Sequence, residues 1–82
     1  MESSTIRRVI QEKLADGRLP HDSIPRVWGG AGAGEMCDAC DEVITKAQFV
    51  MEGIGLAHKS IQFHVQCFYL WDSVRTVPGR TA

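Results

Sequence analysis

Three cysteines and one histidine form the most specific pattern in this sequence. Cys37 and Cys40 make a C-x2-C pair, and an H-x2-C pair, His64 and Cys67, follows after 23 residues. A gap of two residues lets a tight turn, or the first turn of a helix, present both side chains to one ion. Thiolates and imidazoles are preferred ligands of Zn²⁺, and four of them complete a tetrahedral shell. The two pairs together therefore predict one Zn²⁺ per chain.

A closed shell of three cysteines and one histidine is typical of a structural zinc site, because a catalytic zinc keeps one position for water. The sequence has no H-x-E motif, and the glycine-rich residues 29–34 lack the Lys-Ser/Thr ending of a phosphate loop. We therefore expect no enzymatic activity. Structural zinc contributes about 10–16 kcal/mol to folding in small domains, so the metal is expected to fold the C-terminal half.

Two alternatives are open: His58 as the fourth ligand, and a redox dithiol in place of a metal site. His58 could replace His64, but it lies nine residues before Cys67 and shares no turn with it. His21 lies between two prolines and is expected on the surface. The C-x2-C pair could instead be a redox dithiol, but that chemistry is typical of a βαβ thioredoxin context, for which the chain is too short.

Length and composition favour a single small domain over residues 1–82. The chain has 82 residues, is 44% hydrophobic and carries a formal net charge of −1. Domains of this size bury little apolar surface and usually need disulfides or a bound metal for stability. Three cysteines cannot all pair in disulfides, because their number is odd. The sequence has no N-terminal apolar run and no apolar stretch of about 18–20 residues. We therefore expect a cytoplasmic protein that does not enter membranes.

The elements that position the ligands follow from the hydrophobic pattern. Residues 1–17 have apolar side chains at the spacing of one helix face, and Gly17 is suited to end the helix. Residues 18–35 contain prolines and glycines and are expected to form an extended linker, with residues 29–34 as a flexible loop. Residues 36–77 are expected to form the zinc module, namely a knuckle, a β-hairpin (48–52 and 60–63) and a helix over 64–77. The predicted fold class is α+β.

The spacing C-x2-C-x23-H-x2-C, with Phe63 before the histidine and Phe68 after the last cysteine, resembles the first zinc-binding half of a LIM domain. More broadly, residues 36–74 resemble a treble-clef finger, which implies a treble-clef-like fold around a structural zinc. LIM domains have a second set of zinc ligands, and no such set follows Cys67, so LIM partners are not implied. The whole chain is similar to small bacterial proteins without an established activity that share GRLP (17–20), VWGG (27–30) and a tryptophan at Trp71.

Two tryptophans are expected to mark the surroundings of the metal. Trp71 follows Cys67 by four residues and is expected to pack against Phe49 and Phe63. Trp28 either fixes the linker to that cluster or is an exposed anchor for a partner. The helix over residues 1–17 either covers the zinc module, which we expect, or presents its apolar stripe to another protein.

The charge distribution favours a protein partner over nucleic acid. Residues 29–47 have a local net charge of −3, which repels phosphate. The only basic cluster lies on and after the first helix, where we expect a solvated face: Arg7, Arg8, Lys13 and Arg18. The sequence thus favours a zinc-stabilised module that contacts another protein, in the manner of a regulatory adaptor. The alternatives are a nucleic-acid-binding transcriptional regulator and a switch in which zinc-bound Cys37 and Cys40 are oxidised.

Overall fold

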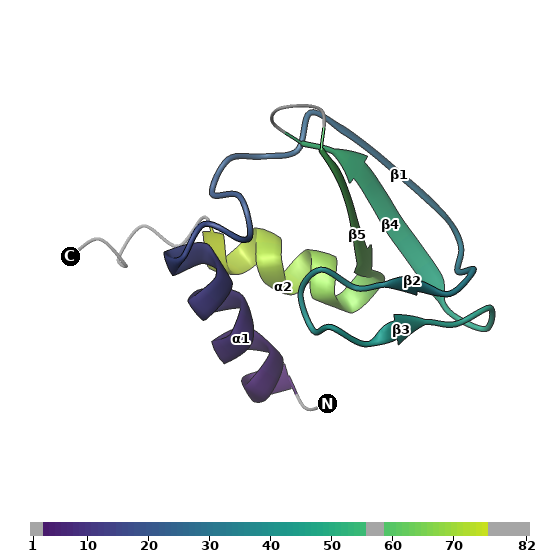
Figure 1. Cartoon of the computed structure of the whole chain (residues 1–82), viewed down its shortest axis with the longest axis horizontal. Coiled ribbons are helices and arrows are strands. Elements are labelled where there is room, and N and C mark those ends of the chain that lie inside the picture. The colour runs from purple at the N-terminus through teal and green to yellow at the C-terminus, as the bar shows by residue number, and fades with distance from the viewer. Residues whose placement is uncertain (1–2, 56–58, 76–82) are drawn as a thin grey trace.

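The computed structural model of the chain describes residues 3–55 and 59–75 (Figure 1). The elements in chain order are α1 (Ser3–Ala15), β1 (Arg26–Ala31), β2 (Glu35–Met36), β3 (Val43–Ile44), β4 (Phe49–Ile54), β5 (Ser60–His64) and α2 (Val65–Arg75). An antiparallel sheet has the order β1-β4-β5, and β2 and β3 form a second antiparallel pair. The predicted mixed α+β class is confirmed. Neither described helix is long and apolar enough to cross a membrane.

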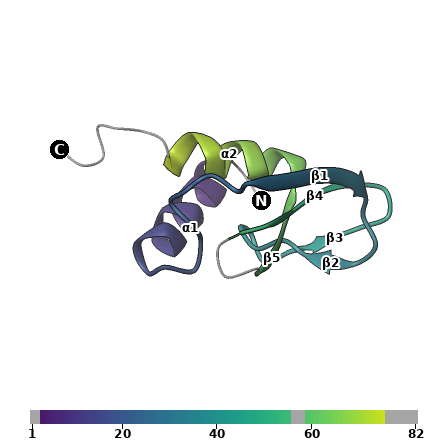
Figure 2. The same ribbon diagram turned by 90° about the horizontal axis from the view of Figure 1, so that it is seen from above.

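Helix α1 covers the C-terminal half, as its apolar stripe predicts. Ile6, Ile10 and Leu14 are buried, and the helix packs against α2 (Figure 2). Gly17 adopts a φ of +85° just after the helix, and the N–H of Leu19 bonds back to the carbonyl of Lys13. This left-handed turn is where glycine is preferred, and it directs the chain back over α2.

The hairpin of β4 and β5 leads directly into α2, as predicted. Phe63 and Trp71 stack with ring centroids 5.3 Å apart, and both are buried. Asp72 and Arg75 form an i, i+3 ion pair on α2. Helix α2 begins at Val65, so His64 ends β5 instead of starting the helix. The last two residues of the predicted helix, 76 and 77, lie outside the described residues.

The expectation of a flexible glycine loop is wrong for residues 29–31. These residues belong to β1, which pairs with β4 over six consecutive residues, from Arg26 opposite Ile54 to Ala31 opposite Phe49. The hydrogen bonds between two strands join backbone N–H and C=O groups, which every residue except proline can supply. The pairing with β4 therefore outweighs the low strand propensity of glycine. Gly32 then passes against the carbonyl groups of Thr45 and Gln48, where a Cβ atom would clash.

Phe49 lies elsewhere than predicted, and of the two alternatives for Trp28 the structure shows the exposed one. Phe49 does not pack on Trp71, because it is 68% exposed, and the aromatic neighbours of Trp71 are Phe63 and Phe68. Trp28 is 46% exposed on β1, and its indole N–H donates to Glu52 at 3.0 Å. Trp28 therefore lies on the open sheet rather than in the core around the metal ligands.

Candidate metal centre

Three cysteines and one histidine converge at one point of the fold. Their ligand atoms all lie within 4.8 Å of one another, and they belong to Cys37, Cys40, His64 and Cys67. The first two come from the knuckle between β2 and β3, the histidine from the end of β5, and the last cysteine from the first turn of α2. All three cysteines are buried. Together these groups could hold one metal ion.

The spacing of the ligand atoms fits a tetrahedral ion. For metal–ligand distances of about 2.0–2.3 Å, the edges of a tetrahedron are about 3.5–3.8 Å long. The Nδ1 atom of His64 lies 3.4 Å from the sulfur of Cys40 and 3.9 Å from that of Cys67. These two separations lie close to the expected edges, and all six separations between the ligand atoms are within 4.8 Å, so the side chains would draw together by up to about 1 Å on a metal.

A hydrogen bond outside the cluster fixes the ring of His64. Its Nε2 lies 3.2 Å from the carbonyl oxygen of Val43 on β3. A carbonyl oxygen only accepts, so Nε2 carries the hydrogen and Nδ1 directs its lone pair toward the sulfurs. Metal-binding histidines almost always donate their second ring N–H in this way. The geometry therefore presents His64 as a ligand through Nδ1.

The knuckle has the backbone of a tight turn. The N–H of Cys37 donates to the carbonyl of Glu42, and the N–H of Asp41 donates to the carbonyl of Cys37, each at 2.9 Å. Asp41 has a φ of +65°, a left-handed conformation that Asp and Asn tolerate better than most residues. The turn folds the C-x2-C pair so that both sulfurs lie on the same side.

The knuckle is fastened to the outer edge of β5. Asp38 donates its N–H to the carbonyl of Gln62 at 2.7 Å and accepts the N–H of Gln62 on its carboxylate at 2.8 Å. The N–H of His64 points to the sulfur of Cys37 at 3.5 Å. These bonds bring the knuckle cysteines to the end of β5, where the H-x2-C pair begins.

The three sulfurs share protons unequally. A hydrogen bond from the Cys67 thiol, joined by backbone N–H groups, lowers the pKa of Cys37. The same hydrogen bond, together with burial, raises the pKa of Cys67, and burial raises the pKa of Cys40. Without a metal, burial and the charge of one thiolate thus oppose ionisation of the neighbouring thiols. A bound dication would stabilise all three thiolates.

Lys13 of α1 supports the knuckle, and the expectation that it lies on a solvated face is wrong. The residue is only 4% exposed. Its ammonium group donates to the carbonyl of Asp38 at 2.9 Å and pairs with the carboxylate of Asp41 at 2.7 Å. Position 13 follows Ile10 by three residues, so it belongs to the buried stripe of the helix. That spacing was the signal in the sequence for its burial.

Replacing Lys13 with methionine tests this support. The Lys13→Met variant keeps an apolar side chain at this buried position but loses both hydrogen bonds to the knuckle. The carbonyl of Asp38 and the carboxylate of Asp41 then lose their partner on α1. We expect the free energy of unfolding to fall by about 1–3 kcal/mol, measured by urea unfolding of the metal-loaded chain. Arg8→Met on the exposed side of α1 is the control. Equal stability of the two variants would show that the contact of Lys13 with the knuckle is not stabilising.

His21 does not join the cluster. His21 is exposed, and its Nε2 lies 2.9 Å from the carbonyl oxygen of Leu14. His58, the alternative ligand to His64, lies outside the described residues. His64, and not His21, lies beside the three cysteines, and His21 is exposed as expected.

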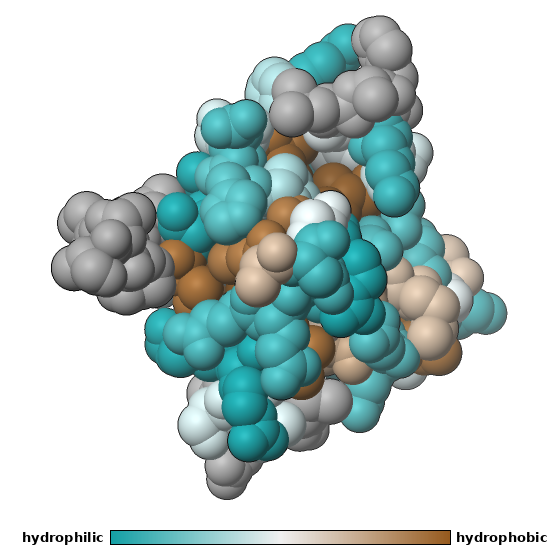
Figure 3. All heavy atoms as spheres, turned by 60° about the vertical axis from the view of Figure 1, so that its left-hand side comes forward, coloured by the Kyte–Doolittle hydropathy of each residue, from teal (hydrophilic) through white to brown (hydrophobic). Residues whose placement is uncertain are grey.

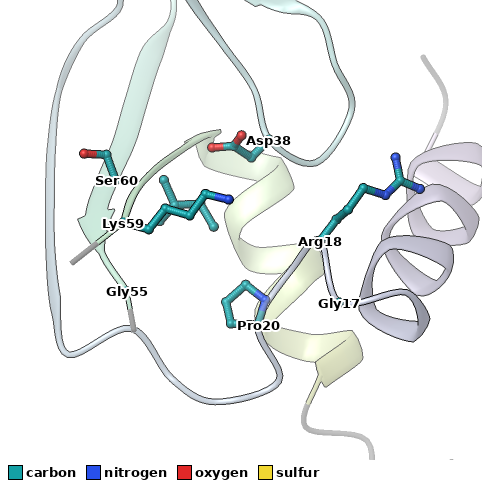
Figure 4. A pocket seen from close by; sticks show the side chains of 8 residues that line it. Gly17, Arg18, Pro20, Asp38, Gly55, Lys59 and Ser60 are labelled. Carbon is teal, nitrogen blue, oxygen red and sulfur yellow. The ribbon is translucent and has the colours of Figure 1, made fainter. Parts of the chain in front are cut away.

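A hollow of about 260 Å³ lies apart from the metal centre, between the turn after α1 and the hairpin (Figure 4). Arg18 points away from it and pairs with Asp16 at 2.8 Å, whereas Lys59 points across it. Asp38 also lines the hollow, so the charge of Lys59 is balanced by a carboxylate. The charged residues of the lining are thus Arg18, Lys59 and Asp38.

No family model, curated protein or solved structure matches this chain. The two predicted ligand pairs converge at one point, and the hydrogen bond to Val43 orients His64 toward the cysteines.

Proposed function

We propose that the chain is a small zinc-stabilised binding module, with one structural Zn²⁺ held by Cys37, Cys40, His64 and Cys67. The observation that carries the proposal is the convergence of four ligand atoms within 4.8 Å, with the Nδ1 lone pair of the histidine directed inward. Three thiolates and an imidazole are a ligand set that favours zinc among the common divalent ions.

The order of elements around the cluster supports a treble-clef type of zinc finger. A knuckle supplies the first pair of ligands, a hairpin follows, and a helix supplies the last ligand from its first turn. This order agrees with the resemblance to the first half of a LIM domain. The proposed role of the metal is to join knuckle, hairpin and helix into one unit.

A structural role for the metal has more support than a catalytic or redox role. Four protein ligands leave no position for water or substrate on a tetrahedral ion. The sulfurs of a redox switch must be accessible to an oxidant, yet Cys37 and Cys40 are 1% and 6% exposed. We therefore propose a module that acts by binding.

The surface beside the metal centre favours a protein as the partner. Phe49 is 68% exposed and borders a hollow of about 340 Å³ that also includes His64 and Val65. Exposed aromatic side chains are typical anchors of protein interfaces. Because a metal ligand lines this hollow, zinc binding would order the surface on which the partner docks. This is the physical basis for a regulatory adaptor.

Nucleic acid has less support as the partner. In the basic cluster of the sequence, Lys13 is buried against the knuckle and Arg18 is paired with Asp16. The side of the molecule shown in Figure 3 is mostly hydrophilic, with apolar side chains in the gaps. The large exposed apolar side chains of the described residues belong to the strands and α2 and include Trp28, Phe49 and Tyr69. Phosphate contacts need more free cations than this cluster offers.

Metal analysis and affinity capture test the two parts of the proposal. Protein purified without chelator should contain one equivalent of zinc, and less than half an equivalent would contradict the proposal. The zinc-loaded chain should capture a protein that the Phe49→Ser variant does not. Tyr69→Ser, which changes an exposed aromatic outside the hollow, is the control. Equal capture by wild type and Phe49→Ser would reject the hollow as the docking surface.

Acid should weaken zinc binding steeply. The pKa values of Cys40 and Cys67 are raised, so both thiols hold protons that zinc must displace at neutral pH. Two displaced protons lower the affinity about a hundredfold for each unit by which the pH falls. Competition with a chelator at several pH values measures this slope. An affinity that does not change with pH would show that these thiols are not ligands.

A further inference from the structure

The three-stranded sheet has two edges, and the knuckle covers one of them. In the order β1-β4-β5, the outer edge of β5 bonds to Asp38 and Cys37 of the knuckle. Figure 1 shows β1 at the other edge, and all six of its residues are exposed. Among the described residues, β1 is therefore the edge of this sheet at which a further strand can add.

One hydrogen bond shows which backbone groups of β1 face outward. Gly32 donates its N–H to the carbonyl of Gln48 at 2.8 Å, in the same register that places Trp28 opposite Glu52. In an antiparallel pair, residues that bond to the partner strand alternate with residues that face away. The even-numbered residues of β1 therefore bond to β4. The N–H and C=O groups that face away belong to Val27, Gly29 and Ala31.

Nothing in β1 protects this edge from pairing. Natural edge strands are usually protected by proline, lysine, a bulge or a covering loop. Strand β1 contains neither proline nor lysine, and its register with β4 is continuous over six residues, so it has no bulge. Arg26 at its start is its only charged residue.

We propose that β1 pairs antiparallel with β1 of a second copy, about a two-fold axis at Gly29. In this register Val27 lies opposite Ala31 of the second copy, and Gly29 lies opposite its own counterpart. Each of these opposed pairs exchanges two N–H···O=C bonds. All the outward backbone groups of the strand are then satisfied.

Neighbouring registers satisfy fewer groups. A shift in one direction places Ala31 opposite Pro25, which has no N–H to donate. A shift in the other direction places Val27 opposite Ala33, whose N–H already donates to Glu35 at 2.7 Å. The register centred on Gly29 is therefore preferred.

The side chains also fit the proposed register. Trp28 lies opposite Gly30 of the second copy, and a Cβ atom at Gly30 would have no neighbour within 4 Å. The indole of Trp28 can therefore lie over Gly30 of the second copy without a clash. The chain carries a net charge of only −1, so two copies repel each other weakly. One strand pair is smaller than a standard interface, so the dimer should dissociate on dilution.

The experiment uses the zinc-loaded full chain in a dilution series. Sedimentation velocity should show a change from the mass of two chains to the mass of one as the protein is diluted. Amide exchange measured by NMR should show the N–H groups of Val27, Gly29 and Ala31 slowing about tenfold or more at high concentration. In a monomer these groups face water and exchange quickly at every concentration.

A variant separates the edge from other surfaces. Gly30→Glu places a carboxylate opposite Trp28 of the second copy, whose indole already bonds to the carboxylate of Glu52, in space that is open in the single chain. It should leave zinc content unchanged while abolishing the dimer. Gln11→Glu on the exposed side of α1 adds the same charge and should dimerise normally. One-chain mass at every concentration would overturn the proposal, and so would a dimer in which the three amides remain fast. Either result would leave the zinc module intact, so the failure is distinct from that of the proposed function.

Discussion

The Cys67→Ser variant should lose both its zinc and the order of its C-terminal half. Cys67 lies in the first turn of α2 and is completely buried. It is the ligand that connects the helix to the knuckle, because the other three lie on the knuckle and at the end of β5. A serine hydroxyl is a poor ligand for zinc, and the metal centre would have only three strong ligands.

The size of this effect follows from the energy of structural zinc. Such sites contribute about 10–16 kcal/mol, which exceeds the whole stability expected for a small domain. We therefore expect the near-UV signal of Trp71 to disappear and the zinc content to fall below half an equivalent. His21→Ala, a histidine outside the cluster, is the control and should change neither quantity. A Cys67→Ser chain that remained ordered without zinc would show that the core alone is sufficient.

The Trp71→Ala variant should lose about 3–5 kcal/mol of stability, the usual cost of removing a large buried aromatic side chain. Trp71 is 1% exposed and stacks on Phe63 of β5. Its indole N–H donates to the carbonyl of Pro20 at 3.0 Å, and the guanidinium of Arg75 lies 4.9 Å from its ring centre. The one side chain therefore joins the sheet, the helix and the segment after α1.

Urea unfolding of the zinc-loaded chain measures this loss. Trp28→Ala is the matched control, because Trp28 is 46% exposed and should cost less than Trp71. Trp71→Phe should fall between the two, since a phenyl ring keeps the stacking but cannot donate to Pro20. If Trp28→Ala were the more destabilising change, Trp71 would not be the centre of the core.

The candidate site was predictable from the sequence because its ligands are set by local spacing. Each pair spans a single turn, and the number of cysteines requires one histidine to complete the shell. The choice of His64 over His58 depended on its sharing a turn with Cys67, and the structure places His64 in the cluster. The helices and the hairpin were also predictable, because their apolar periodicity is strong.

Features that depend on distant contacts were not predictable. Strand β1 contains Gly29 and Gly30, which have low strand propensity, and it forms because β4 supplies hydrogen-bond partners. Phe49 lies in a segment rich in strand-forming apolar residues, which is typical of a buried strand. It is nevertheless the first residue of β4 and remains exposed. Lys13 is buried because the knuckle, about 25 residues away in sequence, supplies its partners.

X-ray absorption at the zinc edge tests the central claim most directly, because it reports the atoms bound to the metal in the intact protein. Chain purified without chelator should give three sulfur ligands at about 2.3 Å and one nitrogen ligand at about 2.0 Å, with no bound water. A shell with fewer than three sulfurs, or one that includes oxygen, would contradict a structural site formed by Cys37, Cys40, His64 and Cys67.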